Sequence, residues 1–152
     1  MAWATTPDGF AIGLPGALSI GSESVESGPV WTHLGWHRIE HGGWDVATRR
    51  LSWRTYVGEG GGAGERGGVE LTAPGRLPEL FRERVAASIV LERFVPLTGD
   101  RGVVITARRD LADGTEIDWH TTLTRGLTWV TPGVRETVDS LVAELRTEYD
   151  VR

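Results

Sequence analysis

The chain has 152 residues, no cysteine, and a formal net charge of −5 from 16 basic and 21 acidic side chains. This balance argues against a general nucleic-acid or membrane-surface binder, because such proteins usually carry an excess of positive charge. Without cysteine there is no disulfide, no thiolate nucleophile and no cysteine-based zinc site. All 16 basic residues are arginine, so a P-loop lysine and a Schiff-base lysine are excluded as well.

Length and hydropathy predict a single domain over residues 1–152. No apolar run reaches the roughly 18 residues that suggest a membrane-spanning helix. Met1–Thr6 lacks the charged and apolar regions of a signal peptide. We therefore expect a cytoplasmic protein that does not enter a membrane.

The chain begins with a predicted short strand. Asp8–Pro15 places Phe10, Ile12 and Leu14 on one face and ends at a Pro-Gly pair, which is typical of a strand. Residues 16–29 are small and polar, and we interpret them as a loop.

A long hairpin is predicted next, over Val30–Val57, with its turn at Gly42 and Gly43. One face of this hairpin would be apolar and would join the core. The other face mixes aromatic and basic side chains, which is unusual for a plain solvent-facing surface. The candidate binding residues on that face are Trp31, His33, His37, Arg50 and Arg54.

This mixed face suggests a binding surface. Arginine forks match carboxylates and phosphates, and indole rings stack with guanidinium groups or planar ligands. The spacing of His33, His37 and His41 also invites a metal site, since imidazole suits zinc, copper, nickel or iron. On a strand, however, four residues span about 13 Å, which is too far for one ion to bridge all three. We therefore predict no metal and no cofactor.

The middle of the chain predicts a loop, a strand and a helix. Gly58–Gly68 is low in complexity and is interpreted as a flexible loop. Val69–Ala73 follows as a strand. A helix is expected from Pro78 to about Ala87, because proline suits the first helical position and apolar residues recur at helical spacing.

Ser88–Leu123 predicts a three-strand antiparallel meander. Its second turn is placed at Asp113-Gly114, since an Asp-Gly pair between two strand-like runs is a strong hairpin signal. That turn would put Arg108 opposite Trp119 and Arg109 opposite Asp118.

The last predicted element is an amphipathic helix after Thr131-Pro132, which resembles an N-cap followed by proline. Its apolar residues recur at helical spacing, so that face should lie on the sheet. The stripe consists of Val134, Val138, Leu141, Val142, Leu145 and Tyr149.

The order of these elements resembles the PsbP-like proteins, which are α/β/α sandwiches with a central antiparallel sheet. The Gly-Phe strand that ends in Leu-Pro within Asp8–Pro15 carries the resemblance, together with the Val30–Val57 hairpin and the helix after Thr131-Pro132. The resemblance implies a non-enzymatic binding or adaptor role. It transfers no functional residue, and many PsbP-like proteins have an export leader that is not visible here.

Together these patterns predict an α+β fold with one antiparallel sheet of about six strands, on which the mid-chain helix and the C-terminal helix pack. No nucleophile–base or metalloprotease motif is found, which favours a non-enzymatic protein-interaction module. We expect the partner to be another protein or a second copy of the chain, and not nucleic acid. Two alternatives are a small metal-dependent hydrolase centred on the histidines and a small-molecule carrier with a pocket between sheet and helix.

Overall fold

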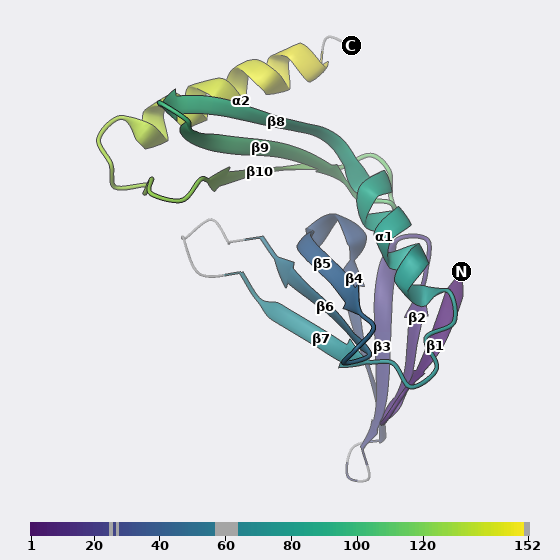
Figure 1. Cartoon of the computed structure of the whole chain (residues 1–152). Coiled ribbons are helices and arrows are strands. Elements are labelled where there is room, and N and C mark those ends of the chain that lie inside the picture. The colour runs from purple at the N-terminus through teal and green to yellow at the C-terminus, as the bar shows by residue number, and fades with distance from the viewer. Residues whose placement is uncertain (25, 27, 57–63, 151–152) are drawn as a thin grey trace. The chain divides into compact units, whose positions relative to one another are not determined.

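The computed structural model describes residues 1–24, 26, 28–56 and 64–150, and the fold is α+β (Figure 1). Antiparallel sheets, a mid-chain helix and a C-terminal helix are present, as predicted. The prediction of a single sheet is wrong, because the described strands form three separate sheets. Backbone contacts divide the chain into two compact units, Met1–Ile89 with Arg109–Ile117 and Val90–Arg108 with Asp118–Arg152.

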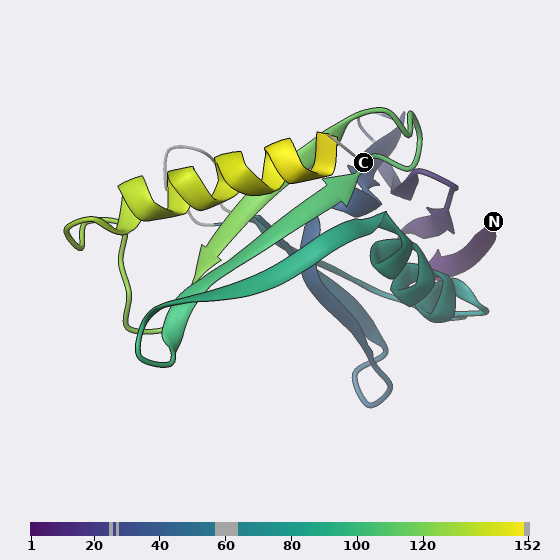
Figure 2. The same ribbon diagram turned by 90° about the horizontal axis from the view of Figure 1, so that it is seen from above.

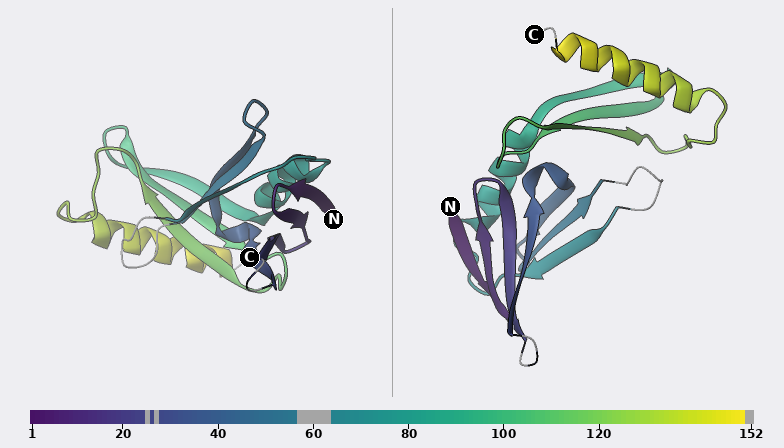
Figure 3. Two further views of the ribbon diagram at one scale, coloured as in Figure 1. Left: turned by 90° about the horizontal axis from the view of Figure 1, so that it is seen from below. Right: turned by 180° about the vertical axis from the view of Figure 1, so that it is seen from behind.

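The first unit begins with a four-stranded antiparallel meander (Figure 3). Its strands are β1 (Ala2–Thr6), β2 (Gly9–Gly13), β3 (Ala17–Ser24) and β4 (Gly28–Gly35). Strand β2 confirms the predicted first strand, whereas β1 was not predicted and β3 lies where a loop was expected. The alternation that defines β3 is present, with Leu18 and Ile20 facing the core. It is hard to recognise because the intervening residues, Ser19 and Gly21, are small.

The predicted Val30–Val57 hairpin is wrong, since its two halves belong to different sheets. A 3₁₀ turn, η1 (Trp36–Arg38), separates β4 from β5 (Ile39–Asp45), and β5 pairs instead with β6 (Arg50–Thr55). The turn therefore lies at residues 46–49, and Gly42 and Gly43 lie inside β5.

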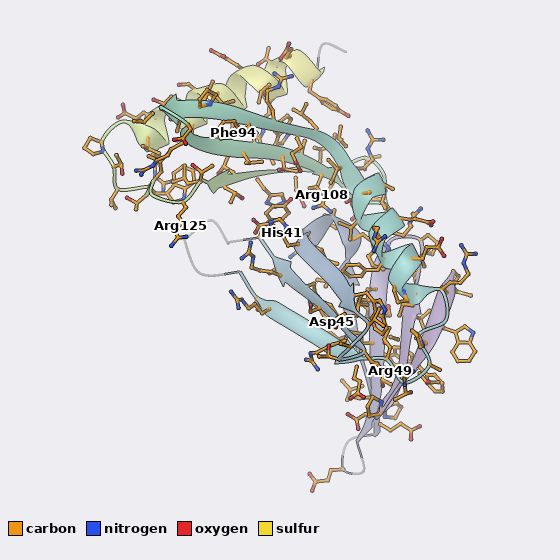
Figure 4. The ribbon with its side chains drawn as sticks, viewed as in Figure 1. His41, Asp45, Arg49, Phe94, Arg108 and Arg125 are labelled. Carbon is orange, nitrogen blue, oxygen red and sulfur yellow. The ribbon has the colours of Figure 1, made fainter. Side chains whose placement is uncertain are left out.

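The side chain of Asp45 determines where this hairpin turns. Its Oδ1 accepts hydrogen bonds from the amides of Ala47, at 2.9 Å, and Thr48, at 3.2 Å. Arg49 completes the turn with a φ of 55°, in the left-handed region. Figure 4 shows Asp45 and Arg49 at this turn. An aspartate that bonds to the backbone two residues later is a turn signal in its own right, and it is stronger here than the Gly-Gly pair.

Strand β7 (Arg66–Glu70) completes the second sheet by pairing with β6. It begins three residues before the strand predicted at Val69–Ala73, so the last residues of the predicted Gly58–Gly68 loop are in fact part of β7. Residues 58–63 of that loop lie outside the described residues.

The core of the first unit lies between the inner faces of these two sheets and helix α1 (Leu77–Ser88). Trp36 is fully buried at its centre, its Nε1 donates to the carbonyl of Leu14 at 2.9 Å, and its ring meets Phe81 edge-to-face at 5.8 Å. Gly42 allows α1 to approach β5, because a Cβ there would lie 2.5 Å from the Phe81 ring. Helix α1 confirms the helix predicted near Pro78–Ala87.

The second unit contains a three-stranded sheet with one helix packed on it (Figure 2). Its strands, in the order β10-β9-β8, are β8 (Ile89–Thr98), β9 (Arg101–Arg109) and β10 (Ile117–Leu123). Helix α2 (Val134–Asp150) buries Val134, Val138 and Leu145 against Val103 and Ile105 of β9. The predicted meander and C-terminal helix are therefore confirmed.

The predicted pairing of β9 with β10 is shifted by one residue. Backbone hydrogen bonds join Asp110 to Glu116 and Thr124 to Gly102, which leaves a loop at residues 110–116 in place of a two-residue turn. Within it, Oδ1 of Asp110 accepts from the amide of Ala112 at 2.9 Å. This register does not place Arg108 opposite Trp119. Arg146 of α2 lies over the Trp119 ring instead, 5.8 Å from its centroid.

Candidate functional site

The predicted binding residues are distributed over three elements of the first unit. Trp31 and His33 lie on β4, His37 lies in η1, and Arg50 and Arg54 lie on β6. The inner faces of both sheets contribute to one core, so the outer faces are two distinct surfaces. The structure therefore brings Trp31 together with His33, and Arg50 together with Arg54, but it does not form the single mixed face that the sequence predicts.

The outer face of the β1–β4 sheet exposes several large apolar side chains. Cross-strand pairing aligns Phe10 of β2 with Trp31 of β4 across Gly21, and Trp3 of β1 with Ile12 of β2. Trp3 is 61% exposed, Phe10 49% and Trp31 44%. We refer to Trp3, Phe10, Ile12 and Trp31 as the aromatic face. Sequence reasoning found Phe10 and Ile12 on one face but not their exposure, and it missed Trp3 because β1 was not predicted.

Local contacts hold the rings of the aromatic face in place. Trp3 and Phe10 meet edge-to-face with their centroids 6.1 Å apart. Trp31 lies over Gly21, where a Cβ would come within 2.8 Å of the indole. Rings with fixed positions lose little conformational entropy when a partner covers them, which favours their use in binding.

His33 marks the polar end of this surface. Its Nδ1 lies 2.5 Å from the hydroxyl of Ser19, a buried side chain on the neighbouring strand. The imidazole is otherwise exposed, so it combines a fixed orientation with a ring edge that is open to a partner.

His37 differs from the other predicted binding residues because it is only 9% exposed. Its Nδ1 lies 4.0 Å from Oδ1 of Asp110, in the loop that joins β9 to β10. These contacts indicate that His37 packs the interior of the first unit and does not form part of its outer surface.

The outer face of the second sheet carries three arginine side chains together with carboxylates. Register places His41, Arg54 and Arg66 in one row across β5, β6 and β7, and Gly43, Ser52 and Gly68 in the next row. Arg50 stands beyond Ser52 on β6. We refer to this surface as the arginine face, and it consists of His41, Arg50, Ser52, Arg54 and Arg66.

Carboxylates offset the charge of the arginine face, because Asp45 and Glu70 are the cross-strand neighbours of Arg50 and Glu40 lies beside Arg54. Oε1 of Glu40 lies 3.6 Å from Arg54 and 3.9 Å from Nε2 of His41. Arg54 and Arg66 are direct cross-strand neighbours, and like charges in that position destabilise a sheet. An added carboxylate or phosphate group would reduce this repulsion and could accept bidentate hydrogen bonds from the guanidinium forks.

The structure does not bring His33, His37 and His41 together. His33, His37 and His41 lie on a strand, a 3₁₀ turn and a second strand, so their four-residue spacing does not place them together. In the part of the chain that the structure describes, no three His, Cys, Asp or Glu side chains are arranged to hold a metal ion.

A small recess lies between β8 and α2 in the second unit. The small-molecule carrier alternative would place its pocket in this kind of position, between sheet and helix. The cavity volume of this recess is about 20 Å³, far below the roughly 300 Å³ at which ligand pockets begin. The lining residues are Leu91, Arg93, Leu145, Glu148 and Tyr149.

Comparison with known proteins identifies no relative. No family model matches the chain, and no curated protein or solved structure matches it either. Among the described residues, no helix is both long and apolar enough to cross a membrane.

Proposed function

We propose that the chain is a non-enzymatic protein-interaction module whose main contact surface is the aromatic face together with the adjoining strand β4. The observation that carries this proposal is the exposure of Trp3, Phe10 and Trp31 on one face of one sheet. Large exposed apolar surface is costly in water and often marks a contact site, and tryptophan is enriched among residues that dominate binding energy.

The arginine face supports the same role as a separate surface. Its guanidinium groups suit carboxylate or phosphate groups on a partner. We propose a protein partner and not nucleic acid, because the chain as a whole carries a net charge of −5. We also propose a cytoplasmic location and a relationship to the PsbP-like proteins. Neither proposal assigns a function to a particular residue.

Site-specific photocrosslinking tests the proposed surface. A benzophenone amino acid is introduced at Phe10 or at Trp31, and at Val130 of the second unit as the matched control, since Val130 is 90% exposed and apolar. Irradiation in cells of the source organism should give a discrete covalent adduct from positions 10 and 31 and none from position 130. Absence of any discrete adduct, or equal adducts from all three positions, would contradict the proposal.

A further inference from the structure

The two edges of the β1–β4 sheet differ in a way that indicates what binds beside the aromatic face. The β1 edge is covered, because the amide of Thr5 donates to the carbonyl of Ala73 and the amide of Thr72 donates to the carbonyl of Thr5. Strand β4 is at the other end of the strand order, with β3 as its single neighbour among the described strands. An uncovered edge exposes a row of backbone donors and acceptors that can pair with another strand.

In an antiparallel ladder, successive residues direct their backbone N–H and C=O groups alternately toward and away from the neighbouring strand. This alternation identifies which backbone groups of β4 lie on its open edge. The amide of Trp36 donates to the carbonyl of Gly16, and in the β3–β4 register this directs the backbone groups of Val30, Thr32 and Leu34 toward β3. The N–H and C=O groups of Trp31, His33 and Gly35 therefore point away from the sheet. None of these three has a backbone partner on that side within the described residues.

Strand β4 also lacks the features that usually block edge pairing. Gly28–Gly35 contains no Asp, Glu, Lys or Arg, and its one proline, Pro29, stands near the start of the strand. Side chains on both of its faces are exposed, with Val30 at 47% and Trp31 at 44%. Natural proteins normally protect such an edge with charges, bulges or a covering segment.

The charges at the two ends of β4 are complementary to one another. Exposed Glu23 and Glu26 lie near its beginning, and exposed Arg38 follows its end. An antiparallel copy of the same strand would set the acidic end of each copy beside the basic end of the other. A parallel arrangement would instead place like charges together.

We infer that two copies of the chain pair through β4, antiparallel about a twofold axis, with Trp31 opposite His33 of the second copy. In this register the amides of Trp31, His33 and Gly35 of one copy can donate to the carbonyls of His33, Trp31 and Pro29 of the second copy, respectively. Pro29 has no N–H to donate, but it lies at the end of the ladder, where the loss is smallest. The inference rests on the proposed function, because it names the partner of the same surface.

The twofold register sets Thr32 of one copy directly against Thr32 of the other, which allows a charge test at an exposed position. Light scattering should give twice the 16.6 kDa of one chain for the parent protein. Thr32→Glu and Thr32→Lys should each weaken dimerisation roughly tenfold or more, because like charges then oppose each other. An equimolar mixture of the two variants should restore the dimer, as a heterodimer.

One control and one further variant separate this result from misfolding. Val46→Glu adds the same charge at a position that is 76% exposed, and it should leave the dimer unchanged. Arg38→Glu replaces the basic end of the edge without altering β4, and it should weaken dimerisation several-fold. A loss of the dimer that the mixed Thr32 variants fail to restore would overturn the register. A monomeric parent protein at high micromolar concentration would overturn the inference as a whole.

The mass of the photo-adduct distinguishes this inference from the proposed function. An adduct of two chains from position 31, lost in Thr32→Glu, supports both. An adduct of another mass that persists in Thr32→Glu overturns self-pairing and leaves an interaction module with a different partner. No adduct, together with a monomeric parent protein, overturns both.

Discussion

The two compact units bury their apolar side chains by different means. In the first, two sheets and α1 enclose a core around Trp36 and Phe81, residues brought together from distant parts of the chain. In the second, α2 covers one face of a three-stranded sheet, and the contacts follow the period of a single helix. A core built on local periodicity can be recognised from sequence, whereas a core built on long-range pairing depends on turns that one residue can move.

The largest expected effect is the loss of the ring at the centre of the first core. Trp36→Ala should lower the free energy of unfolding by about 3–5 kcal/mol, because it opens a cavity beside Phe81 and leaves the Leu14 carbonyl without its indole donor. Chemical denaturation of the purified variant measures this loss. Trp36→Phe is the matched control, since it keeps an aromatic ring and should lose clearly less stability. Equal losses in the two variants would mean that packing contributes little at this position.

The second core should respond according to the depth of each residue of α2. Leu145 is 7% exposed, so Leu145→Ala should lower the free energy of unfolding by about 2–4 kcal/mol. Leu141 is partly buried against the same cluster, and Leu141→Ala should lower the free energy of unfolding by about 1–2 kcal/mol. Urea unfolding followed by circular dichroism compares the two variants. A loss below about 0.5 kcal/mol for Leu145→Ala would mean that the helix stripe does not pack on the sheet.

The same contrast explains how much of the fold could be predicted. The stripe from Val134 to Tyr149 repeats at helical spacing and is flanked by charges, so α2 follows from local sequence alone. The turn of the β5–β6 hairpin does not follow from local sequence alone. A turn at Gly42 and Gly43 is equally plausible until the structure shows the Asp45 carboxylate accepting hydrogen bonds from the amides of Ala47 and Thr48. Trp31 and Arg54 belong to different sheets, because η1 ends β4 and β5 then pairs with β6.

The candidate site depended on which strands pair with one another. Residue types indicated arginine forks and indole rings on one face, and the structure places them on the faces of two different sheets. Pairing determined which side chains share a surface, and pairing is a long-range property. Trp3 could have been found from the sequence, since Ala2–Thr6 precedes a Gly-Phe strand and could pair with it as a hairpin.

A smaller effect tests whether Asp45 determines the turn between β5 and β6. Asp45→Ala should lower the free energy of unfolding by about 1 kcal/mol, because the amides of Ala47 and Thr48 lose their acceptor. Asp45→Asn keeps an acceptor oxygen at the same position and should retain most of the stability. Thermal unfolding followed by circular dichroism measures both variants. If they are equally destabilised, the negative charge of Asp45 matters more than its two hydrogen bonds.

The smallest effect on stability is expected from the double substitution Arg50→Ala with Arg54→Ala. Both side chains stand on an outer face, and the contact of Arg54 with Glu40 is partly exposed to solvent, so the free energy of unfolding should change by less than about 1 kcal/mol. Anion binding should change far more. Inorganic phosphate, followed through the arginine side-chain signals by nuclear magnetic resonance, should bind the parent protein with a dissociation constant on the order of millimolar and lose saturable binding to the double variant. Arg76→Ala with Arg82→Ala removes the same charge from two exposed positions, one at the N-cap of α1 and one within it, and serves as the matched control. If both double variants weaken phosphate equally, net charge accounts for the binding, and the arginine face is not a site for acidic groups of a partner.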